Sequence, residues 1–207
     1  MSLRERKKEK TRHQILRSAR RRFERRGFAA TTMAAVARDA QVATGTLYNY
    51  FTSKQSLLLG LWDDATQHAL AQADEVVAAA GPDVASSCAA LLRLYVEAST
   101  LFSRPVMREV MTSALSSTEE DFASLDRQML AQLMQHLEAW RDAGRLAEDT
   151  DLEAAAGLLY GVATSQMLVF VYSDDVHMED ALRSVDQQVS MVFSGIGRPS
   201  RGARRSR

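Results

Sequence analysis

Apolar residues recur along most of this chain at intervals of three and four residues, which is the spacing of one helix face. Ile15, Ala19 and Phe23 lie four residues apart and form a single apolar stripe. Alternating β-branched residues, the pattern of a half-buried strand, are almost absent, and only three prolines interrupt the 207 residues. The sequence therefore predicts an all-α fold.

Turn and capping residues divide this pattern into about nine helices. Three of them fill the first 50 residues: one that stops at Gly27, one at 33–40 capped by Thr31-Thr32, and one at 44–50. Further helices are expected over 53–80, 83–103, 105–114, 116–144, 150–172 and 177–194. The first two can be capped by Ser53 and Asp83, and further boundaries are set by Gly81-Pro82, Arg104-Pro105, Gly144 and capping boxes that begin at Ser116, Ser117 and Thr150.

The charge is distributed unevenly, although the net charge is zero. Residues 1–54 carry 14 basic and 4 acidic residues, a net charge of +10, whereas residues 55–197 carry 7 and 22, a net charge of −15. Such a basic segment suggests a polyanion as partner, but solvated charge runs that only keep a protein soluble look alike. The charge therefore divides the chain into a basic head over 1–53, an acidic body over 54–195, and a basic tail over 196–207 that we expect to be disordered.

Two helices of the head are joined by only three residues, Gln41-Val42-Ala43, which is the organisation of a helix-turn-helix. The first helix should cross the sugar–phosphate backbone, and the second should lie in the major groove. Gly45 permits a close approach to DNA, and Thr46 offers a hydroxyl and a methyl group to a base edge. The polar groups of Tyr48, Asn49 and Tyr50 should reach phosphates, as should Lys54 at the start of the next helix.

Residues 10–56 resemble the TetR (tetracycline-repressor-like) family in the pattern Arg12-x-x-Ile15-Leu16-x-x-Ala19-x-x-x-Phe23-x-x-x-Gly27-Phe28, Thr31-Thr32, Thr44-Gly45-Thr46-Leu47-Tyr48-Asn49-Tyr50-Phe51-x-Ser53-Lys54. The resemblance implies a DNA-binding head over 1–53 that binds a palindromic operator in a homodimer. The same resemblance implies a ligand-binding and dimerisation body over 54–195, with a ligand pocket and a dimer contact through the last two helices. It also implies DNA contacts from Thr32, Thr44, Gly45, Thr46, Tyr48, Asn49, Tyr50 and Lys54. Two positions depart from the family pattern: Gln41 replaces a turn glycine, and Ala43 replaces a capping serine, which leaves Thr44 as a substitute cap.

Large apolar residues at helical spacing run through the body, where each is first of all a core residue. The methionines among them also suit an adaptable pocket for an apolar or aromatic effector. Candidate effector contacts are Trp62, Tyr95, Phe102, Met107, Met111, Phe122, Met129, Met134 and Met167. Candidate dimer contacts, which could instead pack within one chain, are Leu152, Ala155, Leu159, Val162, Gln166, Val169, Leu182, Val185 and Val189.

The motifs of enzymes and metal sites are missing. The four histidines fall on separate predicted helices, the only cysteine is Cys88, and no phosphate-binding glycine loop is found. We therefore expect no catalytic residue, no metal and no cofactor. No unbroken apolar run reaches the length of a membrane span, and no apolar signal segment begins the chain, so a cytoplasmic protein without membrane contact is expected.

These observations favour a repressor that binds a double-stranded operator as a homodimer and is released by a small apolar effector. Two alternatives remain. One is a DNA-binding regulator without a small-molecule effector. The other is a helical adaptor whose basic head binds an acidic protein or a membrane.

Overall fold

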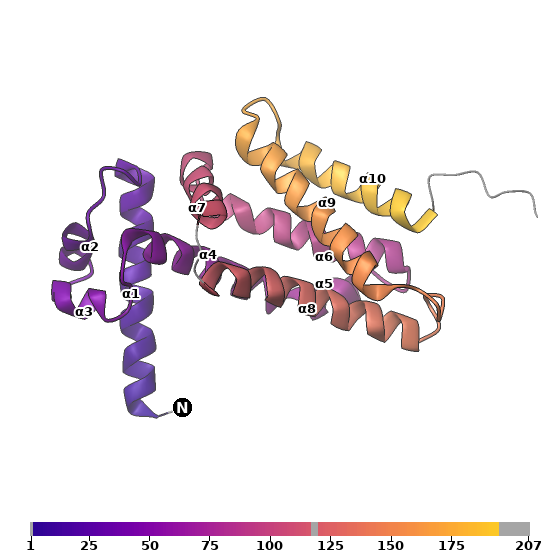
Figure 1. Cartoon of the computed structure of the whole chain (residues 1–207), viewed down its shortest axis with the longest axis horizontal. Helices are drawn as coiled ribbons and strands as arrows, with labels where there is room; N and C mark the ends of the chain where they lie inside the picture. The colour runs from indigo at the N-terminus through magenta and orange to yellow at the C-terminus, as the bar shows by residue number, and fades with distance from the viewer. Residues whose placement is uncertain (1, 117–119, 195–207) are drawn as a thin grey trace, which may run out of the picture.

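The computed structural model describes the backbone of residues 2–116 and 120–194 (Figure 1). Within these ranges it describes all side chains except those of residues 114–127. Among these residues it contains helices and no strand, so the all-α prediction is confirmed. The helices are α1 (Leu3–Arg26), α2 (Met33–Asp39), α3 (Thr44–Tyr48), α4 (Lys54–Leu70), α5 (Ala73–Ala79), α6 (Val84–Ala98), the 3₁₀ turn η1 (Ser99–Leu101), α7 (Arg104–Ser116), α8 (Glu120–Asp142), α9 (Leu152–Tyr172) and α10 (Met178–Ser194).

The head consists of α1 to α3 and lies at one end of the elongated molecule, while α5 to α10 form the body at the other end (Figure 1). The helix α4 runs from the head into the body and packs against α1, α6, α7 and α8. Buried apolar residues form one continuous cluster from Phe23 in the head to Val189 in α10. The two regions therefore share a hydrophobic core, which couples their packing.

Polar contacts also join α1 to the corner between α6 and α7. A guanidinium nitrogen of Arg20 donates to the carbonyl oxygen of Leu101, and the backbone N–H of Ser103 donates to Glu24 Oε1 over 3.0 Å. Nearer the N-terminus, Arg12 pairs with Asp63 of α4 at 3.1 Å. The head is thus held at both halves of α1.

The helix expected over 53–80 is interrupted at Ala71–Gln72, where α4 ends and α5 begins. The carbonyl oxygen of Leu70 accepts a hydrogen bond from Gln132 Nε2 of α8 over 3.0 Å, and Gln132 Oε1 accepts one from the Tyr95 hydroxyl over 3.0 Å. Because α8 satisfies a carbonyl group at the end of α4, the chain can bend there without glycine or proline. The other predicted helices are present with shifted ends.

Several predicted caps are present. Thr32, Ser53 and Asp83 accept hydrogen bonds from backbone N–H groups three residues later. The cap of α9 is Asp151, which accepts from the N–H of Ala154 over 3.0 Å, so the expectation for Thr150 is wrong. The boxes at Ser116 and Ser117 and the tail over 196–207 lie outside the residues that the structure describes with side chains.

One helix among the described residues, α9, is long and apolar enough to cross a membrane, judged by length and composition alone. Its most apolar window has a mean hydropathy of 1.6, although polar residues interrupt it. A core helix passes the same test, and α9 packs against α6, α7, α8 and α10. Only 33% of that window is buried within the chain, however, so α9 carries more apolar surface than its own chain covers.

Candidate nucleic-acid interface

The short helix α3 lies at the outer end of the head (Figure 1) and is anchored by two residues. Leu47 and Phe51, at positions i and i+4, are buried in the core of the head. Their burial fixes which side of the helix faces solvent. Four residues are therefore exposed: Thr44, Gly45, Tyr48 and Asn49. Two more, Thr46 and Tyr50, are half-buried.

The turn before α3 has an unusual backbone and lacks a side-chain cap. Gln41 has φ 55°, in the left-handed region that favours glycine. Ala43 occupies the N-cap position and makes no side-chain hydrogen bond there, so Thr44 does not act as the cap. The exposed Thr44 hydroxyl is consequently left for a partner outside the chain.

Thr32 and Lys54, also expected to contact DNA, lie at the starts of two further helices, α2 and α4. Thr32 is exposed and caps α2, because its Oγ1 accepts from the N–H of Ala35 over 3.2 Å. The hydroxyl hydrogen of Thr32 remains available as a donor to a phosphate. The DNA contacts expected from the eight residues stay predictions; five of the residues are exposed, namely Thr32, Thr44, Gly45, Tyr48 and Asn49.

Lys54 has a structural role that the sequence did not reveal. Its Nζ donates to the carbonyl oxygens of Phe28 over 2.8 Å and of Ala29 over 3.2 Å, and it lies 4.4 Å from the Phe28 ring centroid. This ammonium group therefore ties the start of α4 to the loop after α1. An ammonium has three donors, so one is left for a phosphate.

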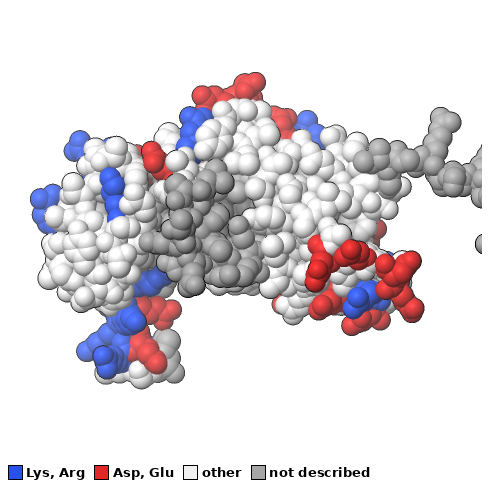
Figure 2. Space-filling model, viewed as in Figure 1, with Lys and Arg blue, Asp and Glu red and all other residues white. Residues whose placement is uncertain are grey.

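The space-filling view shows Lys and Arg atoms over the head, mixed with some Asp and Glu atoms at the N-terminal part of α1, and Asp and Glu atoms gathered over parts of the body (Figure 2). The charge asymmetry found in the sequence is thus an asymmetry in space. A basic head can approach a polyanion while the acidic body is repelled from it.

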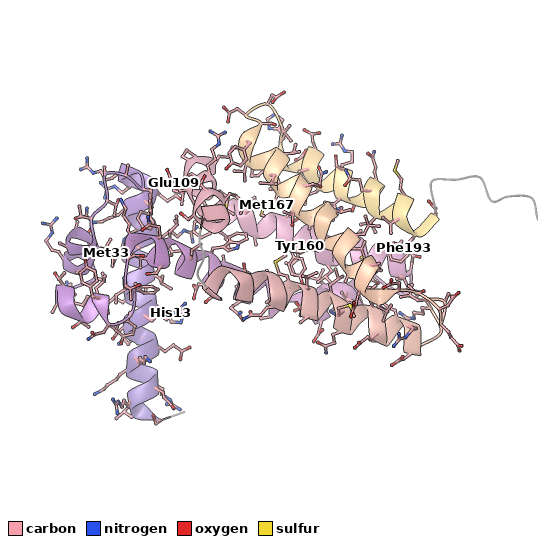
Figure 3. The ribbon with its side chains drawn as sticks, in the orientation of Figure 1. His13, Met33, Glu109, Tyr160, Met167 and Phe193 are labelled. Carbon is pink, nitrogen blue, oxygen red and sulfur yellow. The ribbon has the colours of Figure 1, made fainter. Side chains whose placement is uncertain are left out.

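None of the grooves that the structure describes is lined by the candidate effector residues as a group. Trp62 and Phe102 are buried, with ring centroids 6.4 Å apart. Of the nine residues only Phe102 lines a described groove, one of about 480 Å³ between α1, α4 and η1. Phe122 lies outside the residues whose side chains are described. The rest occupy the core of the body: Tyr95, Met107 and Met111 are buried, and Met129, Met134 and Met167 (Figure 3) are half-buried.

Most candidate dimer residues pack inside their own chain. Leu159, Val185 and Val189 are fully buried, because α9 and α10 pack against each other and against α6. These residues therefore cannot form a free face, and the dimer contact expected from them is wrong. Leu152, Val162, Gln166 and Leu182 are also buried, Ala155 is half-buried, and only Val169 is exposed.

The opposite side of α9 presents a different set, which the sequence analysis did not separate from the buried one. Its exposed residues recur at intervals of three and four, and no charged residue interrupts them from Ala154 onward. This α9 stripe consists of Ala154, Gly157, Leu158, Gly161, Ser165, Val169 and Tyr172.

Comparison with known proteins places the head in a described family. Residues 15–61 match the model for "Bacterial regulatory proteins, tetR family". A curated relative, the HTH-type transcriptional regulator HbdR of Aromatoleum sp. (strain CIB), is 42% identical over 50 residues. That match covers 24% of this chain and only 22% of the relative.

Solved structures share the fold over nearly the whole chain. Thermus thermophilus FadR, a TetR-family repressor solved in complex with lauroyl-CoA, is 22% identical, with a TM-score of 0.71 over 92% of this chain and 99% of that one. RolR in complex with resorcinol is 23% identical, with a TM-score of 0.63 over 90% and 89% of the two chains. The family match and the curated relative show that the head of this chain is that of a TetR family transcriptional regulator, and solved structures of that family share the fold of the whole chain.

Proposed function

We propose that this regulator is a repressor that binds a palindromic operator as a homodimer and leaves it when a small apolar or aromatic effector binds. The observation that carries DNA recognition is the geometry of α3, whose buried Leu47 and Phe51 leave one polar side exposed. Helix-turn-helix proteins insert such a helix into the major groove. The basic head supplies the attraction to phosphates.

The α9 stripe supports dimerisation. Leu158, Val169 and Tyr172 are 55%, 42% and 49% exposed, which is unusual for side chains of this size in one contiguous line. A Cβ built on Gly157 or Gly161 would meet no atom within 4 Å, so the protomer itself does not need glycine there. Small residues at a helix surface let a second helix approach closely. A two-fold contact through α9 would use both features.

Two observations support an effector. Proteins that share this fold have been solved with a fatty acyl-CoA and with resorcinol, both of which carry apolar or aromatic groups. In this chain, α4 connects the head with a body that contains half-buried methionines, which repack readily around a ligand. A ligand that binds better to a body incompatible with the operator would shift the population away from DNA.

Binding of the wild-type protein to the DNA upstream of its own gene, measured by fluorescence anisotropy, tests the proposal. The Thr46→Ala variant should relax the preference at one base position, whereas Tyr48→Phe should weaken binding evenly across sequences. Lys54→Ala is a poor probe, because it also removes the contacts with Phe28 and Ala29. An unaltered base preference in Thr46→Ala would contradict the assignment of this side chain.

A regulator without a small-molecule effector is the second candidate, and one observation favours it. The described candidate residues pack into the core instead of lining a common groove. A screen of acyl-CoA thioesters and phenols, with DNA release as the readout, separates the two. If every ligand that raises the melting temperature leaves operator affinity unchanged, the effector-free regulator is correct.

A further inference from the structure

A groove of about 480 Å³ lies in the head between the C-terminal half of α1 and the end of α2. Its lining contains five arginines and one carboxylate, so its formal charge is +4. We call it the arginine groove. It is lined by Arg21, Arg22, Arg25, Arg26, Arg38 and Asp39, together with Ala30.

Internal pairing neutralises only a small part of this charge. Arg22 donates to both carboxylate oxygens of Asp39, over 2.6 and 3.0 Å, and this hydrogen bonding holds the pKa of Asp39 below its usual value. Arg38 lies 3.9 Å from the same carboxylate and its side chain is 76% exposed. Among the described residues, the guanidinium groups of Arg25 and Arg26 make no hydrogen bond or ion pair with the rest of the chain.

The position of the arginine groove favours a particular anion. Arg38 and Asp39 end α2, and the turn to α3 follows directly. In a helix-turn-helix the first helix crosses the sugar–phosphate backbone while the second reads the bases. The groove therefore adjoins the helix expected to lie over phosphates, outside the surface formed by α3. Guanidinium groups bind phosphate oxygens in a bidentate manner, so several of them in one groove suit a run of phosphodiesters.

We propose that the arginine groove is a second phosphate-binding site of the head and holds DNA backbone phosphates beside the bases that α3 reads. This inference rests on the proposed operator binding and adds a contact that carries no sequence information. Arg25 and Arg26 supply the binding charges. Arg22 instead keeps Asp39 neutralised, so that this carboxylate does not repel the strand.

The test compares single variants with the same charge change. Arg25→Gln and Arg26→Gln remove groove charges, whereas Arg17→Gln removes an exposed arginine from another side of α1. Operator affinity is measured as a function of salt concentration on a duplex with flanking DNA. Each groove variant should lower the slope of log K against log salt by about 0.9, the contribution of one phosphate contact, and weaken operator and unrelated DNA alike. Arg17→Gln should keep the wild-type slope. Circular dichroism checks that helicity is unchanged.

Three outcomes overturn the inference. Slopes of the groove variants equal to that of Arg17→Gln, with wild-type DNA binding intact, refute the groove contact while operator binding stands. A second outcome adds to those equal slopes a thermal stabilisation by inorganic tripolyphosphate that is seen for the wild type and lost in Arg25→Gln. In that case the groove binds a free phosphate compound and not DNA. Absence of DNA binding by the wild type would refute the proposed function itself.

Discussion

Replacing Gly161 by leucine should change the stability of the protomer and the affinity of the dimer in opposite directions. A Cβ at this position meets no atom within 4 Å, so the protomer has room for the larger side chain. Glycine in a helix interior is about 1 kcal/mol less favourable than alanine, and leucine is close to alanine. The isolated protomer should therefore gain roughly 0.8 kcal/mol.

At a two-fold contact the same side chain has the opposite effect. Overpacking a tight contact costs about 1–3 kcal/mol. In an isologous dimer the substitution occurs twice, so the dimer should lose at least about 2 kcal/mol, which is roughly a 30-fold higher dissociation constant.

Sedimentation velocity and urea unfolding at several protein concentrations separate the two effects. The wild-type midpoint should rise with concentration, because dimerisation stabilises the folded state. At low protein concentration, the urea midpoint of Gly161→Leu should be higher than that of the wild type. It should also depend less on protein concentration. Ala139→Leu, at an exposed position of α8, is the matched control. An unchanged dissociation constant for Gly161→Leu, or a wild-type monomer at micromolar concentration, would refute the assignment of the α9 stripe.

Three further outcomes follow from the structure. Ala43→Ser should add the missing cap of α3 and stabilise the protein by about 1 kcal/mol in urea unfolding, and no gain would show that the turn cannot place the hydroxyl. Burial lowers the pKa of His136, against the opposing charge of Asp74, so the unfolded chain binds the proton more readily and stability should fall as pH drops below about 6.5. The His136→Phe variant should lose less stability over that range, and equal losses would contradict this origin. Burial raises the pKa of the Cys88 thiol to about 12, so a thiol reagent should modify Cys88 only on unfolding, and fast modification of the native protein would show an open path to it.

The helix pattern of this protein was predictable because it is encoded locally. Caps such as Thr32 and Asp83 lie within three residues of the N–H groups that they satisfy. The break at Ala71 was not predictable. Gln132, which donates to the carbonyl oxygen of Leu70 at this break, lies 62 residues further along the sequence. Hydrogen bonds of that range depend on the tertiary fold and leave no local signal.

The exposed residues of the head were predictable for a similar reason, since Leu47 and Phe51 define the inner side of α3. The exposure of the α9 stripe was not predictable, because α9 is apolar on the side that its own chain covers and on the side that it leaves open. Periodicity cannot assign a buried side when both sides are apolar. The structural use of Lys54 also depends on the loop at Phe28, which only the folded chain brings within reach.

The contacts of α1 with the corner between α6 and α7 limit how heads could be exchanged between regulators. A chimera joined at residue 53 would lose the hydrogen bonds of Arg20 and Glu24 unless the donor head carried the same two side chains in the same places. Changing only exposed residues of α3 leaves those contacts untouched. Operator specificity in this protein is therefore better re-engineered by a few surface substitutions than by transplanting a domain, and gene duplicates could diverge by the same short route.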